Sequence, residues 1–334
     1  MQVFVAAALT ATQQRSRAWL TQLRVQVRRP GDLAFRGLLT LFVLAVLGVV
    51  LGVAWILLSS SLPTIRAFGL SFLGNEAFDP VHNVYGVRPA IFGTLVTSAF
   101  AMICAVPIGV GTAVFLVDFC PRALRGPIAF LVDALAAIPS VVIGLWGFLV
   151  FAPWLQHTGE PWLHQHLGFL PFFQGTAHGV GLLAAGLILT MMILPIVTAI
   201  SREVMLVVPT AQREALLALG ATRWEVIRHA VLPFARIGIL GGAILALGRA
   251  LGETIAVTLV IGNQAAPPSA SLFNTGYTLS SVIANQFSEA TGGLFISAVM
   301  EAGLILLLLT LITNILARLL VARLGRASMG GIVA

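Results

Sequence analysis

The stretch EALLALGATRWEVIRHAVLP, residues 214–233, places charged side chains in the middle of a sequence that otherwise consists of long apolar runs. Gly220 is the residue type that most readily adopts a left-handed turn, so a helix before it is expected to end there. Thr222 and Glu225 have the spacing of a capping box, which predicts that a second helix begins directly after the turn. Pro233 is expected to close this second helix. The stretch therefore predicts two short helices joined at a glycine turn.

The first helix of this pair is expected to run over residues 211–219, with Thr210 as its N-cap. On the second helix, Trp224, Ile227 and Val231 recur at intervals of three and four residues, which places them on one face. An apolar face on a helical hairpin suits docking into a groove of a partner protein. An ordinary surface hairpin shows the same pattern, so the residues alone leave both interpretations open.

The composition indicates a membrane protein. Of the 334 residues, 58% are hydrophobic and 9% are charged, and the mean hydropathy is +1.00; a soluble domain has about 25% charged residues. The net charge of +7 comes from arginines in short segments between apolar runs, so it indicates orientation in a membrane and argues against nucleic-acid binding. Cys104 and Cys120 have neither the spacing of metal ligands nor that of a disulfide framework.

Six apolar segments are long enough to cross the hydrocarbon layer, which takes roughly 20 helical residues. They lie near residues 37–60, 91–117, 128–153, 179–200, 237–262 and 294–320. The N-terminal segment holds six arginines, the loops after the second and fourth spans hold two and five, and the C-terminus holds three, whereas the alternate loops hold two, none and none. Because positive charge is enriched on the inner side, both termini are expected to face the cytoplasm.

These spans divide the all-helical chain into five parts. The parts are a cytoplasmic tail at 1–36, a first transmembrane helix at 37–62, an outer loop at 63–90, a core of five transmembrane helices at 91–322 with a cytoplasmic loop at 201–236, and a cytoplasmic tail at 323–334. The outer segments 63–90, 154–178 and 263–293 are expected to form short interfacial helices or gates.

The fifth span, GGAILALGRALGETIAVTLVIGN, contains two charged residues, Arg249 and Glu253, four positions apart. On a helix they share one face and lie within hydrogen-bond reach of each other. An arginine inside a membrane is usually paired or faces a polar pathway. The pair is therefore a candidate site for a tetrahedral oxyanion, which the guanidinium fork can bind. The alternative is a buried ion pair that only fixes helix packing.

Other residues favour structural interpretations. Arg88, at the outer end of the second span, is more typical of an interface anchor than of an anion site. The histidines at 157, 164 and 166, with Glu160, lie in a tryptophan-bearing loop that favours a solvated interface over a metal site. Gly144 and Gly147 suit either close helix packing or a kink.

The cytoplasmic stretch resembles the loop of ABC importer permeases with the pattern E-A-A, three residues, G, nine residues, I, one residue, L-P. The matching positions are Glu214, Ala215, Gly220, Leu232 and Pro233. Leu216 and Ala230 stand where the pattern has alanine and isoleucine. The resemblance implies a type I ABC importer permease fold, with coupling helices that seat in a cleft of a separate ATPase. It also implies a coupling role for these five positions, and for Trp224 on the face between them.

ATP hydrolysis by this chain itself is excluded on chemical grounds. A phosphate-binding P-loop needs a lysine that reaches the phosphates, and all 19 basic residues of the chain are arginines. The chain is therefore expected to be a transport subunit and not an enzyme. It is expected to hold no cofactor, with ATP and magnesium on a partner ATPase.

The run LGRALGETIAVTLVIGN at 247–263 resembles the fifth span of phosphate-specific ABC permeases of the PstC type. Further similar runs are YGVRPAIFGTLVTSAFA at 85–101, IPSVVIGLWG at 138–147 and FNTGYTLSSVIANQF at 273–287. The resemblance covers roughly residues 85–322 and implies that Arg249 and Glu253 lie on the phosphate path. It further implies a bacterial inner-membrane location, a sister permease of the PstA type, two ATPase subunits and an outer phosphate-binding protein.

Three other functions remain possible at this level. An ABC permease for sulfate or molybdate would share the cytoplasmic loop, because a guanidinium does not distinguish these oxyanions by itself. A carrier driven by an ion gradient would transport without ATP and would leave the charged hairpin unexplained. A membrane scaffold that senses phosphate without transporting it is the third.

Overall fold

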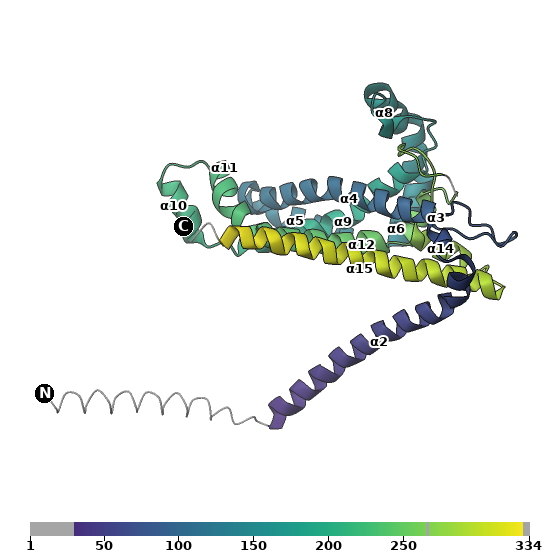
Figure 1. Cartoon of the computed structure of the whole chain (residues 1–334). Coiled ribbons are helices and arrows are strands. Elements are labelled where there is room, and N and C mark those ends of the chain that lie inside the picture. The colour runs from purple at the N-terminus through teal and green to yellow at the C-terminus, as the bar shows by residue number, and fades with distance from the viewer. Residues whose placement is uncertain (1–29, 265–266, 330–334) are drawn as a thin grey trace. The chain divides into compact units, whose positions relative to one another are not determined.

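A computed structural model describes residues 30–264 and 267–329 (Figure 1). The chain forms two compact units, one ending at Ile56 and the other beginning at Leu57. The described part of the first unit is the beginning of helix α2 (Pro30–Phe68), which continues into the second unit. Its leucine, valine and phenylalanine side chains are exposed over most of its length, as expected of a helix in lipid.

Six helical stretches in the described residues are long and apolar enough to cross a membrane. They are Ala34–Phe68, Arg88–Phe119, Ser140–Leu167, Leu182–Leu206, Arg223–Gly252 and Gly293–Arg323. This confirms the prediction of an all-helical protein with six spans. The predicted N-terminal tail falls mostly on residues outside the described part, as does the end of the predicted C-terminal tail; residues 30–36 and 323–329 are helical.

The third span differs from the prediction, which placed it at 128–153. Helix α5 (Arg122–Ala137) ends before Ile138, whose backbone is extended, and a new helix begins at Ser140. Pro139 explains the break, because its ring disfavours helical geometry in the residue before it. The membrane-spanning helix runs from there to Leu167 through α6 (Ser140–Trp146), η2 (Gly147–Phe151), α7 (Ala152–Trp154), η3 (Leu155–Gly159) and α8 (Glu160–Leu167).

Helix α9 (Leu182–Leu206) is the centre of the second unit. It packs along α4 (Arg88–Val114) and α12 (Leu232–Gly252), and also contacts α5. Most of the alanines, leucines and isoleucines on these facing surfaces are buried. Helix α15 (Gly293–Met329) lies along α12, and Figure 1 shows it as the long yellow helix labelled below α12.

The outer connections contain short helices, and one of them folds back into the bundle. Helix α14 (Leu279–Gln286) packs between α4, α13 (Ile255–Val260) and α15. Its first turn is buried, and the Leu279 N–H donates a hydrogen bond of 2.9 Å to the Thr94 hydroxyl of α4. The prediction of a short helix in this segment is correct, but its first turn lies in the packed core and not at the membrane interface.

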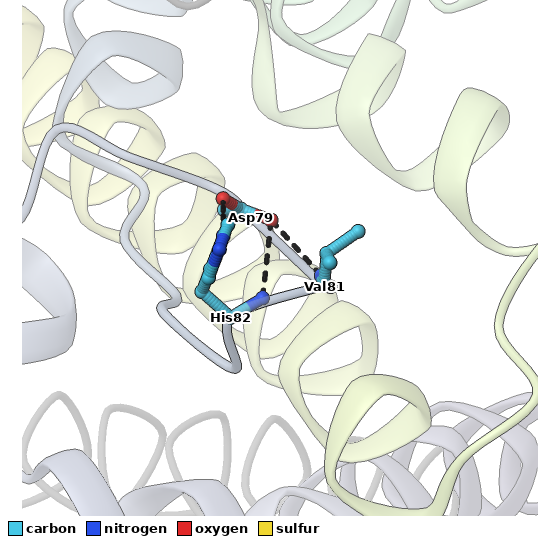
Figure 2. Close-up of polar contacts among 3 residues, drawn as sticks. All are labelled: Asp79, Val81 and His82. Atoms are coloured by element: carbon cyan, nitrogen blue, oxygen red, sulfur yellow. Dashed lines mark hydrogen bonds and ion pairs between the residues drawn. The ribbon is translucent and has the colours of Figure 1, made fainter.

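The connection between α2 and α4 contains helix α3 (Ser71–Gly74) and a tight turn. Asp79 organises the turn, because its carboxylate accepts hydrogen bonds from the backbone N–H groups of Val81 and His82, at 2.9 and 3.3 Å (Figure 2). The His82 ring also contacts this carboxylate at 2.6 Å. The hydrogen bond from His82 lowers the pKa of Asp79 below its ordinary value. The Asp79 carboxylate therefore stays ionised at a lower pH than a free aspartate.

Gly144 allows α6 and α13 to approach closely. A Cβ atom on Gly144 would lie 2.7 Å from the Ala256 Cα atom and 2.9 Å from the Leu259 side chain. We therefore expect Gly144→Ala to destabilise the folded protein by about 1–3 kcal/mol, the usual cost of overpacking. Thermal unfolding of the purified protein measures this. Gly126→Ala is the matched control, because nothing lies within 4 Å of that position; equal melting temperatures for the two variants would contradict the close approach.

Candidate functional site

A break in the fifth membrane helix forms the first part of the candidate site. Helix α12 ends at Gly252, and Glu253 has an extended backbone, with φ −71° and ψ 127°. Helix α13 then begins at Ile255. The predicted span at 237–262 is therefore interrupted, and it begins earlier, at the helix that contains Arg223. Unwound backbone at membrane depth occurs where it is buried in protein or lines a polar cavity.

Arg249 lies in the last turn of α12, and Glu253 is the first residue after that helix. The Arg249 Nη2 atom is 3.7 Å from the Glu253 Oε2 atom. They form the ion pair that their spacing predicts, but the distance is too long for a direct hydrogen bond. Glu253 also follows the last helical residue, so the two side chains do not share a helix face as predicted. The pair is consequently looser than an ideal helical pair.

The Glu253 backbone is held by helix α14. The Ser280 hydroxyl donates a hydrogen bond of 2.8 Å to the Glu253 carbonyl oxygen, which the end of α12 leaves without a helical partner. Thr278 caps α14 through a capping box with Ser281. The buried hydroxyl groups of Thr278, Ser280 and Ser281 thus form a polar layer beside the break.

The two charged groups differ in their exposure. The Glu253 side chain is 9% exposed, whereas the Arg249 side chain is 43% exposed at the surface of this single chain. Among the described residues, Glu253 is the one acidic group within 4 Å of the guanidinium. A guanidinium carries five N–H donors in a planar fork. Arg249 therefore retains N–H donors beyond its contact with Glu253.

The loop between α9 and α12 forms the second part, about 24 Å away along α12 from Pro233 to Arg249, given 1.5 Å per helical residue. Helix α10 (Thr210–Ala218) ends before Gly220, whose φ of +86° confirms the left-handed turn. Thr222 and Glu225 form the predicted capping box and start helix α11 (Arg223–Val226). Thr210 is not the N-cap as predicted: Pro209 occupies that position, without a side-chain hydrogen bond.

Pro233 does not close the second helix, contrary to the prediction. The chain continues from α11 through one π-helical turn, η5 (Ile227–Val231), directly into α12. The N–H of Leu232 bonds to the Ile227 carbonyl, five residues back. Such a shift in hydrogen bonding just before a proline accommodates the missing donor without ending the helix.

The predicted apolar face divides into a buried and an exposed part. Ile227 and Val231 are buried against the C-terminal ends of α4 and α9, whereas Trp224 is 56% exposed. Ile227 and Val231 therefore stabilise the loop and are not free for docking, which corrects the sequence interpretation. Leu219, beside the glycine turn, is 84% exposed. Trp224 and Leu219 give the tip of the loop an apolar surface outside the membrane helices.

A groove lies between α10 and the beginning of α12. It has a volume of about 590 Å³, and Ala215 and Pro233 line it together with His229 and Arg236. Glu214 is exposed beside it, and Leu232 is half-buried against the apolar cluster below. The residues that match the permease pattern therefore lie near one another around the groove and the turn, and their coupling role stays a prediction.

The structure also shows charged residues that the sequence interpretation missed. Asp118, in the helical turn that follows α4, forms an ion pair with Arg213 of α10, although 95 positions separate them. Glu301 is buried in α15, and its Oε2 atom has no hydrogen-bond partner in the described part of the chain. The sequence signal for Asp118 was an acidic residue next to a segment in which the other charged residues are arginines. The signal for Glu301 was an acidic residue inside a membrane span. Glu160 was predicted to lie in a solvated interfacial loop, and this prediction is wrong. It is buried at the start of α8 and accepts a hydrogen bond of 2.9 Å from the Gly179 N–H.

Residues 105–326 match the protein family described as binding-protein-dependent transport system inner membrane component. Together with the six spans, this match defines the class of the protein: a multi-pass component of the inner membrane that serves a transport system dependent on a binding protein.

Within this class the chain belongs to the PstC family of permeases. It is 46% identical over 287 residues to the phosphate transport system permease protein PstC of Mesorhizobium japonicum, covering 85% of this chain and 86% of that protein. It is 43% identical over 293 residues to PstC of Haemophilus influenzae, covering 86% of this chain and 92% of that protein. PstC 2 of Mycobacterium tuberculosis is 44% identical over 276 residues, covering 80% of this chain and 85% of that protein.

Solved ABC importers share the fold. A chain of a bacterial alginate ABC transporter, crystallised with an alginate-bound periplasmic protein, superposes with a TM-score of 0.55 at 17% identity, over 88% of this chain and 97% of that chain. A second alginate importer structure gives a TM-score of 0.52 at 17% identity, over 80% of this chain and 96% of that chain. The predicted fold class, an ABC importer permease, is confirmed.

Proposed function

We propose that this chain is a permease subunit of an ATP-driven phosphate importer and that Arg249 and Glu253 lie on the phosphate path. The observation that carries the proposal is an exposed arginine at a broken membrane helix, in a chain that is 46% identical to a phosphate permease. A guanidinium with unused donors binds a tetrahedral oxyanion through charge-assisted hydrogen bonds. Glu253 neutralises the empty site and prevents the anion from binding too tightly.

The exposure of Arg249 also supports a second permease subunit. An arginine that faced lipid would be costly, so its exposed surface in the isolated chain calls for a protein neighbour or a water-filled path. A sister permease of the PstA type provides this neighbour in our proposal. The transport path then lies between the two subunits, and an outer phosphate-binding protein delivers the anion to it.

ATP is used by two separate ATPase subunits at the cytoplasmic side. In the proposal the pair of helices α10 and α11 in the loop at 201–236 binds them, with Glu214, Ala215, Gly220, Trp224, Leu232 and Pro233 at or beside the contact surface. The abundance of arginines in this loop supports its cytoplasmic position, and with it cytoplasmic termini. ATP and magnesium belong to these partners, and this chain needs no cofactor of its own.

Transport follows an alternating-access cycle. Closure of the ATPases moves α10 and α11, and α12 connects this movement directly to the broken helix about 24 Å away. Coupling requires that ATP and phosphate favour different states of the permease. The continuous helix through Pro233 provides a stiff connection between the two parts of the site.

Uptake of radiolabelled anions tests the proposal. Cells that lack the chain are compared with cells in which it is restored, each supplied with phosphate, sulfate or molybdate at low concentration. We expect restored uptake of phosphate alone, lost when ATP is depleted. Restored uptake of sulfate or molybdate would contradict the proposed substrate, and uptake that survives ATP depletion would favour a gradient-driven carrier. A chain whose restoration changes no uptake would favour a scaffold.

A further inference from the structure

An ion pair fastens the first helix of the cytoplasmic loop to the membrane bundle. The Arg213 Nη1 atom of α10 binds the Asp118 Oδ1 atom, and the Arg213 Nη2 atom donates a hydrogen bond of 2.8 Å to the Met205 carbonyl oxygen of α9. One guanidinium on α10 thus contacts the cytoplasmic ends of both α4 and α9. Both side chains are largely buried, with exposures of 21% for Arg213 and 15% for Asp118.

The position of Asp118 is fixed by its own segment. It lies in the π-helical turn η1 (Phe115–Phe119), which continues α4. The Arg125 Nη2 atom of α5 donates a hydrogen bond of 2.8 Å to the Val117 carbonyl oxygen in the same turn. A π-helical turn leaves carbonyl groups free for such partners. The carboxylate is therefore held in place by the backbone of the membrane helix, and movement of Arg213 acts on α4 itself.

Helix α10 has few other attachments. None of its side chains is fully buried, and Leu216 is the member of the helix that packs against the apolar cluster below. Asp118 is also sensitive to the loss of its partner, because its Oδ2 atom is buried and accepts no hydrogen bond from any described residue. A buried carboxylate that loses its one cationic partner is strongly disfavoured. The pair is consequently the main polar connection that resists separation of α10 from α4.

We propose that Asp118 and Arg213 form a positioning pair that transmits the movement of α10 to α4 when ATP is used. This inference rests on the proposed function, in which the loop contacts an ATPase. A movement of α11 passes into α12 through the continuous helix, whereas a movement of α10 passes into α4 through the ion pair. In this way one cytoplasmic loop moves both α4 and α12, the two membrane helices that pack along α9.

The complete importer, reconstituted in proteoliposomes with its sister permease, ATPases and binding protein, tests the pair. The readout is the number of phosphate ions transported per ATP hydrolysed. Asp118→Asn and Arg213→Gln are each expected to lower this ratio about tenfold, as expected for the loss of a coupling free energy, while ATP hydrolysis continues. The exchanged variant, with Asp118→Arg and Arg213→Asp together, is expected to restore most of the ratio.

The control is Glu203→Gln, which removes an exposed ion pair with Arg202, of 3.1 Å, at the same end of α9. It is expected to leave the ratio unchanged. A normal ratio in both single variants would overturn the inference, as would an exchanged variant that stays uncoupled. Loss of the complex from the membrane in both single variants would show a role in assembly only and would also overturn it. Failure of the unmodified importer to take up phosphate would instead overturn the proposed function.

Discussion

The variant Arg249→Ala is expected to abolish phosphate uptake while the transporter still assembles. The substitution removes the guanidinium at the end of α12 and leaves Glu253 as a lone acidic group beside the path, which repels an anion. Charge-assisted hydrogen bonds contribute about 1.5–3 kcal/mol each, so losing two of them reduces the uptake rate by at least about a hundredfold. Phosphate uptake in proteoliposomes and co-purification of the subunits measure the two effects separately.

Two further variants make the Arg249 result specific. Arg249→Lys keeps the charge but loses the planar fork, so it is expected to retain only part of the uptake. Leu245→Ala shortens an exposed apolar side chain one turn earlier on α12 and is expected to transport normally. If Arg249→Ala removed the complex from the membrane, the ion pair would be structural. Normal uptake by Arg249→Ala would remove the pair from the phosphate path.

The second large effect is expected for Gly220→Pro, which should separate ATP hydrolysis from transport. The Gly220 φ of +86° lies far from the value near −65° that proline requires. Proline would also remove the N–H that donates a hydrogen bond of 3.0 Å to the Leu217 carbonyl. The turn between α10 and α11 must then change, and we expect the phosphate transported per ATP to fall at least about tenfold.

The matched control for this position is Gly220→Asn, because asparagine adopts the left-handed conformation more readily than other residues with a side chain. Nothing lies within 4 Å of a Cβ atom at this position, so the asparagine side chain has room. It is expected to transport nearly as well as the unmodified protein. Equal coupling in the proline and asparagine variants would mean that the shape of the turn does not matter for the ATPase contact.

The number of spans followed from the sequence because length and hydropathy alone determine it, whereas the helix ends depended on local backbone chemistry. Pro139 and Pro233 show why. Both interrupt apolar runs, yet Pro139 separates two helices and Pro233 lies within a continuous helix. The difference is the π-helical turn before Pro233, and such a turn depends on packing against α4 and α9 that no local pattern reveals.

The charged residues of the candidate site were also predictable only in part. The spacing of Arg249 and Glu253 correctly predicted an ion pair, but it did not show that the helix ends between them and that α14 holds the freed carbonyl. The capping box at Thr222 was predictable because all its contacts are local. The pair of Asp118 and Arg213 was not, because only the packed fold brings together residues 95 positions apart.

The close approach at Gly144 and the bond to Ser280 have a joint consequence for motion. Helix α13 is pressed against α6, and the end of α12 is tied to α14. The backbone between these two attachments consists of Glu253 and Thr254, which belong to neither helix. The Glu253 carbonyl accepts the Ser280 hydroxyl and the Thr254 carbonyl accepts the Thr258 N–H, so α14 and α13 hold the break as a fixed bend. Arg249 lies in the last turn of α12, so a movement of α12 that reorients the proposed anion ligand also acts on α13 and α14.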